Sequence, residues 1–142
     1  MTRIVVLGGG PGGYEAALVA AQLGAEITVV DSDGIGGSAV LTDCVPSKTL
    51  IATAEAAWNA AESRRLGVKL RGAEDLGASA IGVDLSRVNN RVKALAQAQS
   101  ADIHNRLITA GVRVLPGRHL VRVLRDGYGP AEEAVEVRAG ES

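Results

Sequence analysis

The chain has 142 residues, of which 46% are hydrophobic and 22% are charged, enough for one soluble domain with a buried core. Its net charge of −1 argues against nucleic acid or an anionic membrane surface as the main partner, and no apolar run reaches the roughly 20 residues of a membrane span. A single cysteine excludes a disulfide framework and a thiolate zinc site, and the absence of a signal-peptide apolar region favours a cytoplasmic protein.

The first thirty or so residues predict one β-α-β unit, the length expected for a single crossover between parallel strands. Residues 4–7 form an apolar run without alternation, which is typical of a parallel strand buried on both faces. A glycine loop at 8–13 precedes an alanine-rich helix at 14–23. A second apolar strand at 26–30 ends at Asp31.

The rest of the chain predicts helices followed by short strands. We expect an alanine-rich helix at 47–65, a loop or weak strand at 66–83, and the longest helix at 84–110, capped by Asp84 and ended by Gly111. A third parallel strand is expected at 112–115, and short runs at 120–124 and 134–137 suggest a small antiparallel meander. The apolar residues of the longest helix fall at helical spacing: Leu85, Val88, Val92, Leu95, Ala96, Ile103 and Leu107.

The glycine loop carries the pattern Gly8-x-Gly10-x-x-Gly13, which between a strand and a helix indicates dinucleotide binding. Gly8 permits a tight turn, Gly10 lets a pyrophosphate approach the backbone, and Gly13 lets helix and strand pack closely. Asp31 at the end of the second strand can accept hydrogen bonds from ribose hydroxyls, as FAD or NAD would require. The pattern does not decide between these two cofactors. The residues predicted to bind are Gly8, Gly10, Pro11, Gly12, Gly13 and Asp31.

Residues 36–48 read Gly-Gly-Ser-Ala-Val-Leu-Thr-Asp-Cys-Val-Pro-Ser-Lys. This stretch resembles the redox segment of the flavoprotein disulfide reductases, the family of lipoamide dehydrogenase and glutathione reductase, which reads roughly Gly-Gly-Thr-Cys-x4-Cys-x-Pro-Ser-Lys. The second cysteine of that segment is present as Cys44, whereas Ala39 occupies the position of the first. The resemblance therefore implies that the flavin machinery is kept and the dithiol chemistry is lost. The lipoamide-dehydrogenase-like NAD(P)H:quinone reductases, which also lack the first cysteine, are the variant that the chain most resembles.

The resemblance implies an α/β fold: a Rossmann-like FAD-binding domain with a parallel sheet, flanking helices and a small antiparallel β meander. It implies that Cys44 faces the flavin ring and that Lys48 reaches the flavin N5 edge. It places the loop of residues 36–38 along the FAD pyrophosphate and the end of the third strand near the adenine. The cofactor-binding residues added on this basis are Ser32, Gly36, Gly37, Ser38, Lys48, Gly117 and Arg118.

Complete members of the family also contain an NAD(P) domain and a dimerisation domain with a catalytic His-Glu pair. We expect residues 1–142 to be the truncated N-terminal part of the FAD-binding domain, with those two domains absent and no activity by itself. In the complete, homodimeric enzyme, FAD would take a hydride from NAD(P)H and reduce a quinone or dye. The alternative is a truncated, non-catalytic dinucleotide-binding module. A third possibility, the NAD-binding domain of an ordinary dehydrogenase, is disfavoured by residues 36–48.

The remaining polar and aromatic residues give weaker signals. His104 and His119 have no cysteine or acidic partner at metal-ligand spacing, so we expect no metal site and assign both to the surface or to a strand edge. Trp58 is expected in the core or at an interface. No Ser, His and Asp order suggests hydrolysis.

Overall fold

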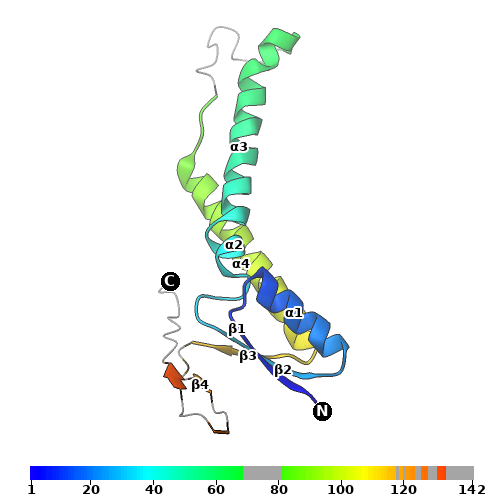
Figure 1. Ribbon diagram of the computed structural model, residues 1–142. Coiled ribbons are helices and arrows are strands. Elements are labelled where there is room, and N and C mark those ends of the chain that lie inside the picture. The colour runs from blue at the N-terminus through cyan, green and yellow to red at the C-terminus, as the bar shows by residue number, and fades with distance from the viewer. Residues whose placement is uncertain (69–80, 118, 120, 124–125, 128–130, 134–142) are drawn as a thin grey trace.

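The computed structural model describes residues 1–68, 81–117, 119, 121–123, 126–127 and 131–133. It confirms an α/β fold built on a three-stranded parallel sheet (Figure 1). The elements are β1 (Arg3–Leu7), α1 (Pro11–Gln22), β2 (Glu26–Asp31), α2 (Gly37–Leu41), α3 (Cys44–Glu62), the 3-10 helix η1 (Ser63–Leu66), α4 (Leu85–Thr109), β3 (Arg113–Pro116), β4 (Val121–Val123) and β5 (Ala131–Glu133).

The parallel strands lie in the order β1-β2-β3, so each crossover moves the chain one strand along in the same direction. Right-handed crossovers of this kind bring their helices to one face of the sheet. Accordingly, α1 packs on β2, α4 packs on β3, and the two helices contact each other. The carboxyl ends of the three strands therefore share one edge, where ligands bind in open α/β sheets.

The core lies between this sheet face and the two helices that cover it. Leu107 of α4 and Val29 of β2 are the largest fully buried side chains, and Ala17 of α1 is also inaccessible to solvent. The rest of the core cluster comes from the same elements, from the segment around α2 and from the connection between α4 and β3: Leu18, Ile27, Ile35, Val40, Ile103 and Val112. Alanine and other aliphatic side chains fill this core cluster, because helices and sheet lie close together.

The apolar stripe predicted on α4 is buried only in part. Val92, Ala96, Ile103 and Leu107 are buried, whereas Leu85 is 72% exposed. Figure 1 shows the cause: α3 and the first half of α4 project away from the sheet as a helical hairpin. Helix α4 contacts α3 and α2. Among the described residues, these two neighbours bury Val92 but leave the start of the stripe exposed.

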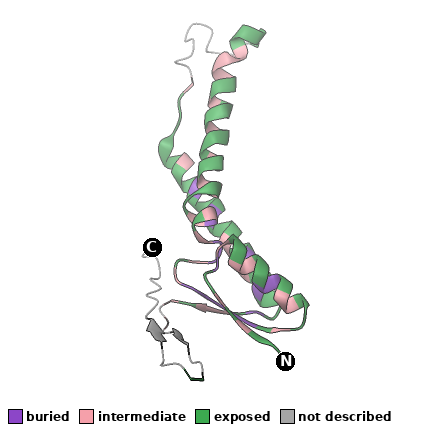
Figure 2. Ribbon diagram, in the orientation of Figure 1, coloured by how far each residue is buried: buried purple, intermediate pink, exposed green. Residues whose placement is uncertain are grey.

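The helical hairpin, defined here as α3 with residues 85–95 of α4, is largely solvent-exposed (Figure 2). No residue of α3 is buried, although Leu50 and Ile51 are apolar. Trp58 is 67% exposed, so it does not belong to the core, and its alternative assignment to an interface stays a prediction. The hairpin thus presents apolar side chains that the described residues do not cover.

Several predicted boundaries were wrong. Helix α3 begins at Cys44, before the predicted start at 47, and α2 was not predicted. Pro46 lies in the first turn of α3, where a missing N–H costs no helical hydrogen bond, so the helix can begin before it. Strands β4 and β5 pair antiparallel, as expected of a meander, but β5 lies at Ala131–Glu133. The predicted run at 134–137 lies outside the described residues.

Other local predictions are confirmed. The side chain of Asp84 caps α4 by accepting a hydrogen bond from the Arg87 amide, with an N–O distance of 3.1 Å. Gly111 follows the helix end with φ at +80°, a conformation that glycine adopts without strain. Among the described residues, the helices include none with both the length and the hydropathy of a membrane span.

Candidate dinucleotide-binding site

The glycine turn between β1 and α1 has the geometry that its sequence predicts. Gly8 has φ at +96°, and its amide donates to the Val30 carbonyl at 2.8 Å. A Cβ on Gly13 would lie 1.9 Å from the Gly8 carbonyl oxygen, so only glycine allows α1 to start this close to β1. A Cβ on Gly10 would meet no atom within 4 Å. Gly10 therefore borders open space, while Gly8 and Gly13 are fixed by the fold.

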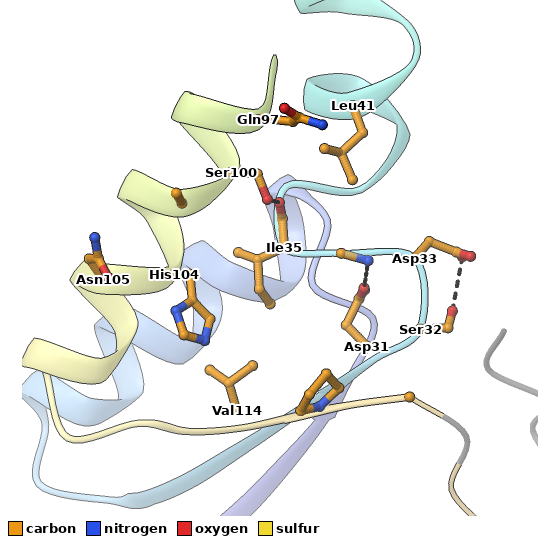
Figure 3. A pocket seen from close by; sticks show the side chains of 14 residues that line it. Asp31, Ser32, Asp33, Ile35, Leu41, Gln97, Ser100, His104, Asn105 and Val114 are labelled. Atoms are coloured by element: carbon orange, nitrogen blue, oxygen red, sulfur yellow. Dashed lines mark hydrogen bonds between the residues drawn. The ribbon is translucent and has the colours of Figure 1, made fainter. Parts of the chain in front are cut away.

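Asp31 ends β2 directly beside this turn and is only 8% exposed. One carboxylate oxygen accepts a hydrogen bond from the Gly9 amide at 2.5 Å. The other accepts from the Gly34 amide at 2.6 Å (Figure 3). The sequence predicted an acceptor for ribose hydroxyls. In the structure both oxygens already bind the backbone, which a pattern-based assignment could not foresee.

A second glycine loop follows β2 and touches the first. Gly36 has φ at +103°, and its amide donates to the Gly9 carbonyl at 2.7 Å. A Cβ on Gly37 would lie 2.9 Å from the Cα of Gly10, too close for any side chain. The two loops are thus packed backbone against backbone, with the start of α1 and the start of α2 adjoining.

A cavity of about 480 Å³ opens beside these loops, between residues 31–35, the end of β3 and helix α4. Ile35, Leu41 and Val114 contribute apolar wall, and Figure 3 shows His104 pointing toward Ile35 and Val114. The polar residues on the α4 side are Gln97, Ser100, His104 and Asn105. The Ser100 hydroxyl donates to the Ile35 carbonyl at 2.5 Å and so ties α4 to the second glycine loop.

The structure brings together some predicted site residues and separates others. Asp31, Ser32 and Gly117 all line the cavity, and the Gly117 amide donates to the Asp31 carbonyl at 3.1 Å. The Ser32 hydroxyl donates to the carboxylate of its neighbour Asp33 at 2.9 Å. Ser38 is exposed at the start of α2. Arg118 lies outside the described residues.

Cys44 and Lys48 do not line this cavity. Cys44 is the first residue of α3, exposed and unpaired, and Lys48 follows one turn later on the same helix, also exposed. Ala39, at the position of the missing cysteine, lies in α2. Within the described residues no three histidine, cysteine or acidic side chains are grouped as a metal site would require.

His104 is one of several cavity residues that were not predicted from the sequence, which assigned it to the surface or to a strand edge. A usable signal exists in hindsight. Gln97, Ser100 and His104 recur at helical spacing along α4, next to its apolar stripe. A polar row beside a buried stripe marks the border of a helix face. Only the fold shows that these polar side chains line the same cavity as Asp31.

The family model and the sequence relatives that match this chain all name pyridine-nucleotide oxidoreductases or dehydrogenases. Residues 2–138 match the family model described as pyridine nucleotide-disulphide oxidoreductase. An NAD(P)H dehydrogenase (quinone) of Mycobacterium tuberculosis is 51% identical over 125 residues, covering 83% of this chain and 23% of that protein. Dihydrolipoyl dehydrogenase 2 of Haloarcula marismortui is 32% identical over 142 residues, covering 94% of this chain and 28% of that protein.

Solved structures agree with these sequence relatives. The crystal structure of LpdA from Mycobacterium tuberculosis matches with a TM-score of 0.73 and 40% identity, over 94% of this chain and 30% of that chain. A HOCl-induced flavoprotein disulfide reductase of Escherichia coli matches with a TM-score of 0.61 at 18% identity, over 94% of this chain and 26% of that chain, which supports the fold alone. The chain therefore spans between a quarter and a third of these two structures.

Proposed function

Since the chain belongs to the pyridine nucleotide-disulphide oxidoreductase family, we propose that it binds FAD as the N-terminal part of an FAD-binding domain. The complete protein would be an NAD(P)H-dependent oxidoreductase with a quinone-like acceptor, cytoplasmic and homodimeric. The relative with 51% identity carries the name NAD(P)H dehydrogenase (quinone), which supports this choice of acceptor.

The observation that carries the proposal is the cradle formed by the two glycine loops. No atom lies within 4 Å of the position that a Cβ on Gly10 or Gly12 would take, so backbone is accessible at the start of α1. Helix N-termini bind phosphate through free amides and the helix dipole. A pyrophosphate fits here, because Gly37 closes the other side of the cradle by contacting Gly10.

The adjoining cavity suits the adenosine end of the same cofactor. Its lining includes Asp31, Ser32 and Gly117, and combines aliphatic side chains with His104. A flat ring with hydrogen-bonding edges needs this mixture of apolar wall and a few polar groups. Asp31 retains free lone pairs for a ribose hydroxyl, because each carboxylate oxygen can accept two hydrogen bonds.

Bound FAD would supply the ring that takes up a hydride and passes electrons to the acceptor. Cys44 and Lys48 lie on α3 at i and i+4, so they share one side of the helix start. We assign both to the flavin end: Cys44 adjusts the surroundings of the ring, and Lys48 adds a positive charge at its edge. With Ala39 in place of a second thiol, electrons cannot be held as a disulfide within the chain.

The visible absorption spectrum of the chain, reconstituted with FAD and freed of excess cofactor, tests the proposal. Flavin bands that remain with the protein support it. A chain that is folded by circular dichroism but retains no flavin would instead support the alternative, a non-catalytic module that binds another nucleotide or a protein partner.

A further inference from the structure

The two carboxylate oxygens of Asp31 accept hydrogen bonds from the amides of Gly9 and Gly34. We propose that Asp31 is a positioning residue that locks the two glycine loops together before any nucleotide binds. The inference rests on the proposed function only for its effect on nucleotide affinity. The lock itself is a property of the unliganded chain.

The hydrogen bonds around Asp31 link two segments that are distant in sequence: the first glycine loop and residues 31–36. Asp31 holds Gly9 through the amide, and the carbonyl of Gly9 holds the amide of Gly36 at 2.7 Å. Asp31 also holds Gly34 from the same loop as Gly36. Gly9 is thereby fixed through both of its backbone polar groups. Hydrogen bonds to an ionised carboxylate are stronger than neutral ones, and they are the more effective here because the group is buried.

Packing around Gly9 supports the positioning role of Asp31. It also explains why glycine stands at this position, where the dinucleotide-binding pattern allows any residue. Gly9 is the x of Gly-x-Gly, yet a Cβ there would lie 2.7 Å from Cδ1 of Ile35 and 3.1 Å from an Asp31 oxygen. Ile35 is itself buried in the core. The absence of a side chain at Gly9 lets its amide reach Asp31 while Ile35 fills the space beside it.

The consequence concerns the cradle for the pyrophosphate. The loops are held at a fixed separation by Asp31 and by the contact of Gly37 with Gly10. A site organised in this way loses less conformational freedom when a ligand binds. The carboxylate therefore affects the phosphate end of a nucleotide through the loops, in addition to any direct bond with ribose.

Amide hydrogen exchange on the unliganded wild-type chain is the first test. We expect the amides of Gly9 and Gly34 to be protected without nucleotide, and exchange of both at unstructured rates would overturn the proposal. Asp31→Asn keeps the shape but replaces one acceptor oxygen by an NH₂ group. We expect at least one of the two amides to exchange roughly 10-fold faster or more, the loss of one charge-assisted bond.

A matched control separates a local lock from general destabilisation. Asp102→Asn removes a carboxylate that is exposed on α4, and it should leave Gly9 and Gly34 protected as in the wild type. The amides of the β2 strand should stay protected in both variants. If Asp31→Asn accelerates exchange of the β2 amides as much as that of Gly9 and Gly34, the effect is global and the lock is rejected.

Binding of two nucleotides then distinguishes the lock from a ribose contact. The probes are ADP and 2′,3′-dideoxy-ADP, which lacks both ribose hydroxyls. A lock predicts that Asp31→Asn weakens binding of both probes by a similar factor, about 10-fold. Weakened ADP binding with unchanged dideoxy-ADP binding would mean a ribose contact only and would overturn the inference. If the wild type binds neither probe and retains no FAD, the proposed function fails. The lock is then accepted or rejected by the hydrogen-exchange result.

Discussion

At the carboxyl edge of the sheet, Asp31 is 8% exposed and binds two backbone amides, whereas on the helical hairpin Trp58 is 67% exposed. The sheet edge satisfies its buried polar groups with partners from within these 142 residues. The hairpin contains apolar side chains that the described residues leave uncovered. The proposed nucleotide site therefore depends on contacts already present within the described residues, whereas we expect the apolar side chains of the hairpin to be covered by contacts with other molecules or segments.

The largest expected effect is on activity. Hydride transfer needs the nicotinamide and flavin rings held at about 3–3.5 Å, and an open site admits water. We predict that the chain alone oxidises NAD(P)H with a quinone no faster than free FAD does. Steady-state turnover is the measurement. Turnover well above that of free FAD, abolished by Lys48→Ala, would show that these residues suffice for catalysis.

At the carboxyl edge of the sheet, Gly13→Ala should lower the stability of the fold more than any other glycine-to-alanine substitution. Its Cβ would lie 1.9 Å from the backbone oxygen of Gly8, which cannot rotate away. We expect a loss of about 3 kcal/mol or more in the free energy of unfolding, measured with denaturant. Gly12→Ala is the control, because its Cβ would meet no atom within 4 Å on the same helix. That variant should be neutral or slightly more stable. Equal losses in both variants would refute the close approach.

Helix α4 crosses both regions and allows them to be compared within one element. Leu107→Ala should cost about 2–5 kcal/mol, because that side chain is fully buried against the sheet. Leu85→Ala should change stability by less than about 0.5 kcal/mol, since Leu85 is 72% exposed. Thermal or chemical unfolding of the two variants measures this difference. Similar losses would mean that the start of α4 is covered in solution.

The smallest stability effect is expected at Trp58, where the measured property is association. Exposed apolar surface promotes contacts between molecules. We predict that Trp58→Lys lowers self-association in analytical ultracentrifugation with less than about 0.5 kcal/mol change in stability. Leu23→Lys, an exposed apolar residue at the end of α1, serves as control and should leave association unchanged. If the wild type and Trp58→Lys self-associate equally, the hairpin is not the surface through which the molecules associate.

Most features that depend on neighbouring residues could be predicted from the sequence, whereas features that depend on contacts between distant residues could not. The β-α-β unit and the Asp84 cap are local patterns, and the structure confirms them. Of the two partners of Asp31, Gly34 is three residues away, but Gly9 lies 22 residues away, and nothing in either loop marks that second hydrogen bond. The cavity position of His104 depends on how α4 crosses the sheet edge, which periodicity does not encode. Tertiary contacts therefore determined these two missed features, whereas the missed α2 and the early start of α3 are local.

The most direct test of the central claim, FAD binding on the two glycine loops, compares the wild type with Gly10→Val after FAD reconstitution. A side chain at Gly10 enters open space, so the variant should fold and melt like the wild type. The same side chain would occupy the approach of the pyrophosphate. We predict stoichiometric flavin absorbance in the wild type and at least a 100-fold weaker affinity in the variant, on the order of 3 kcal/mol. Equal flavin binding by two equally folded proteins would contradict the account.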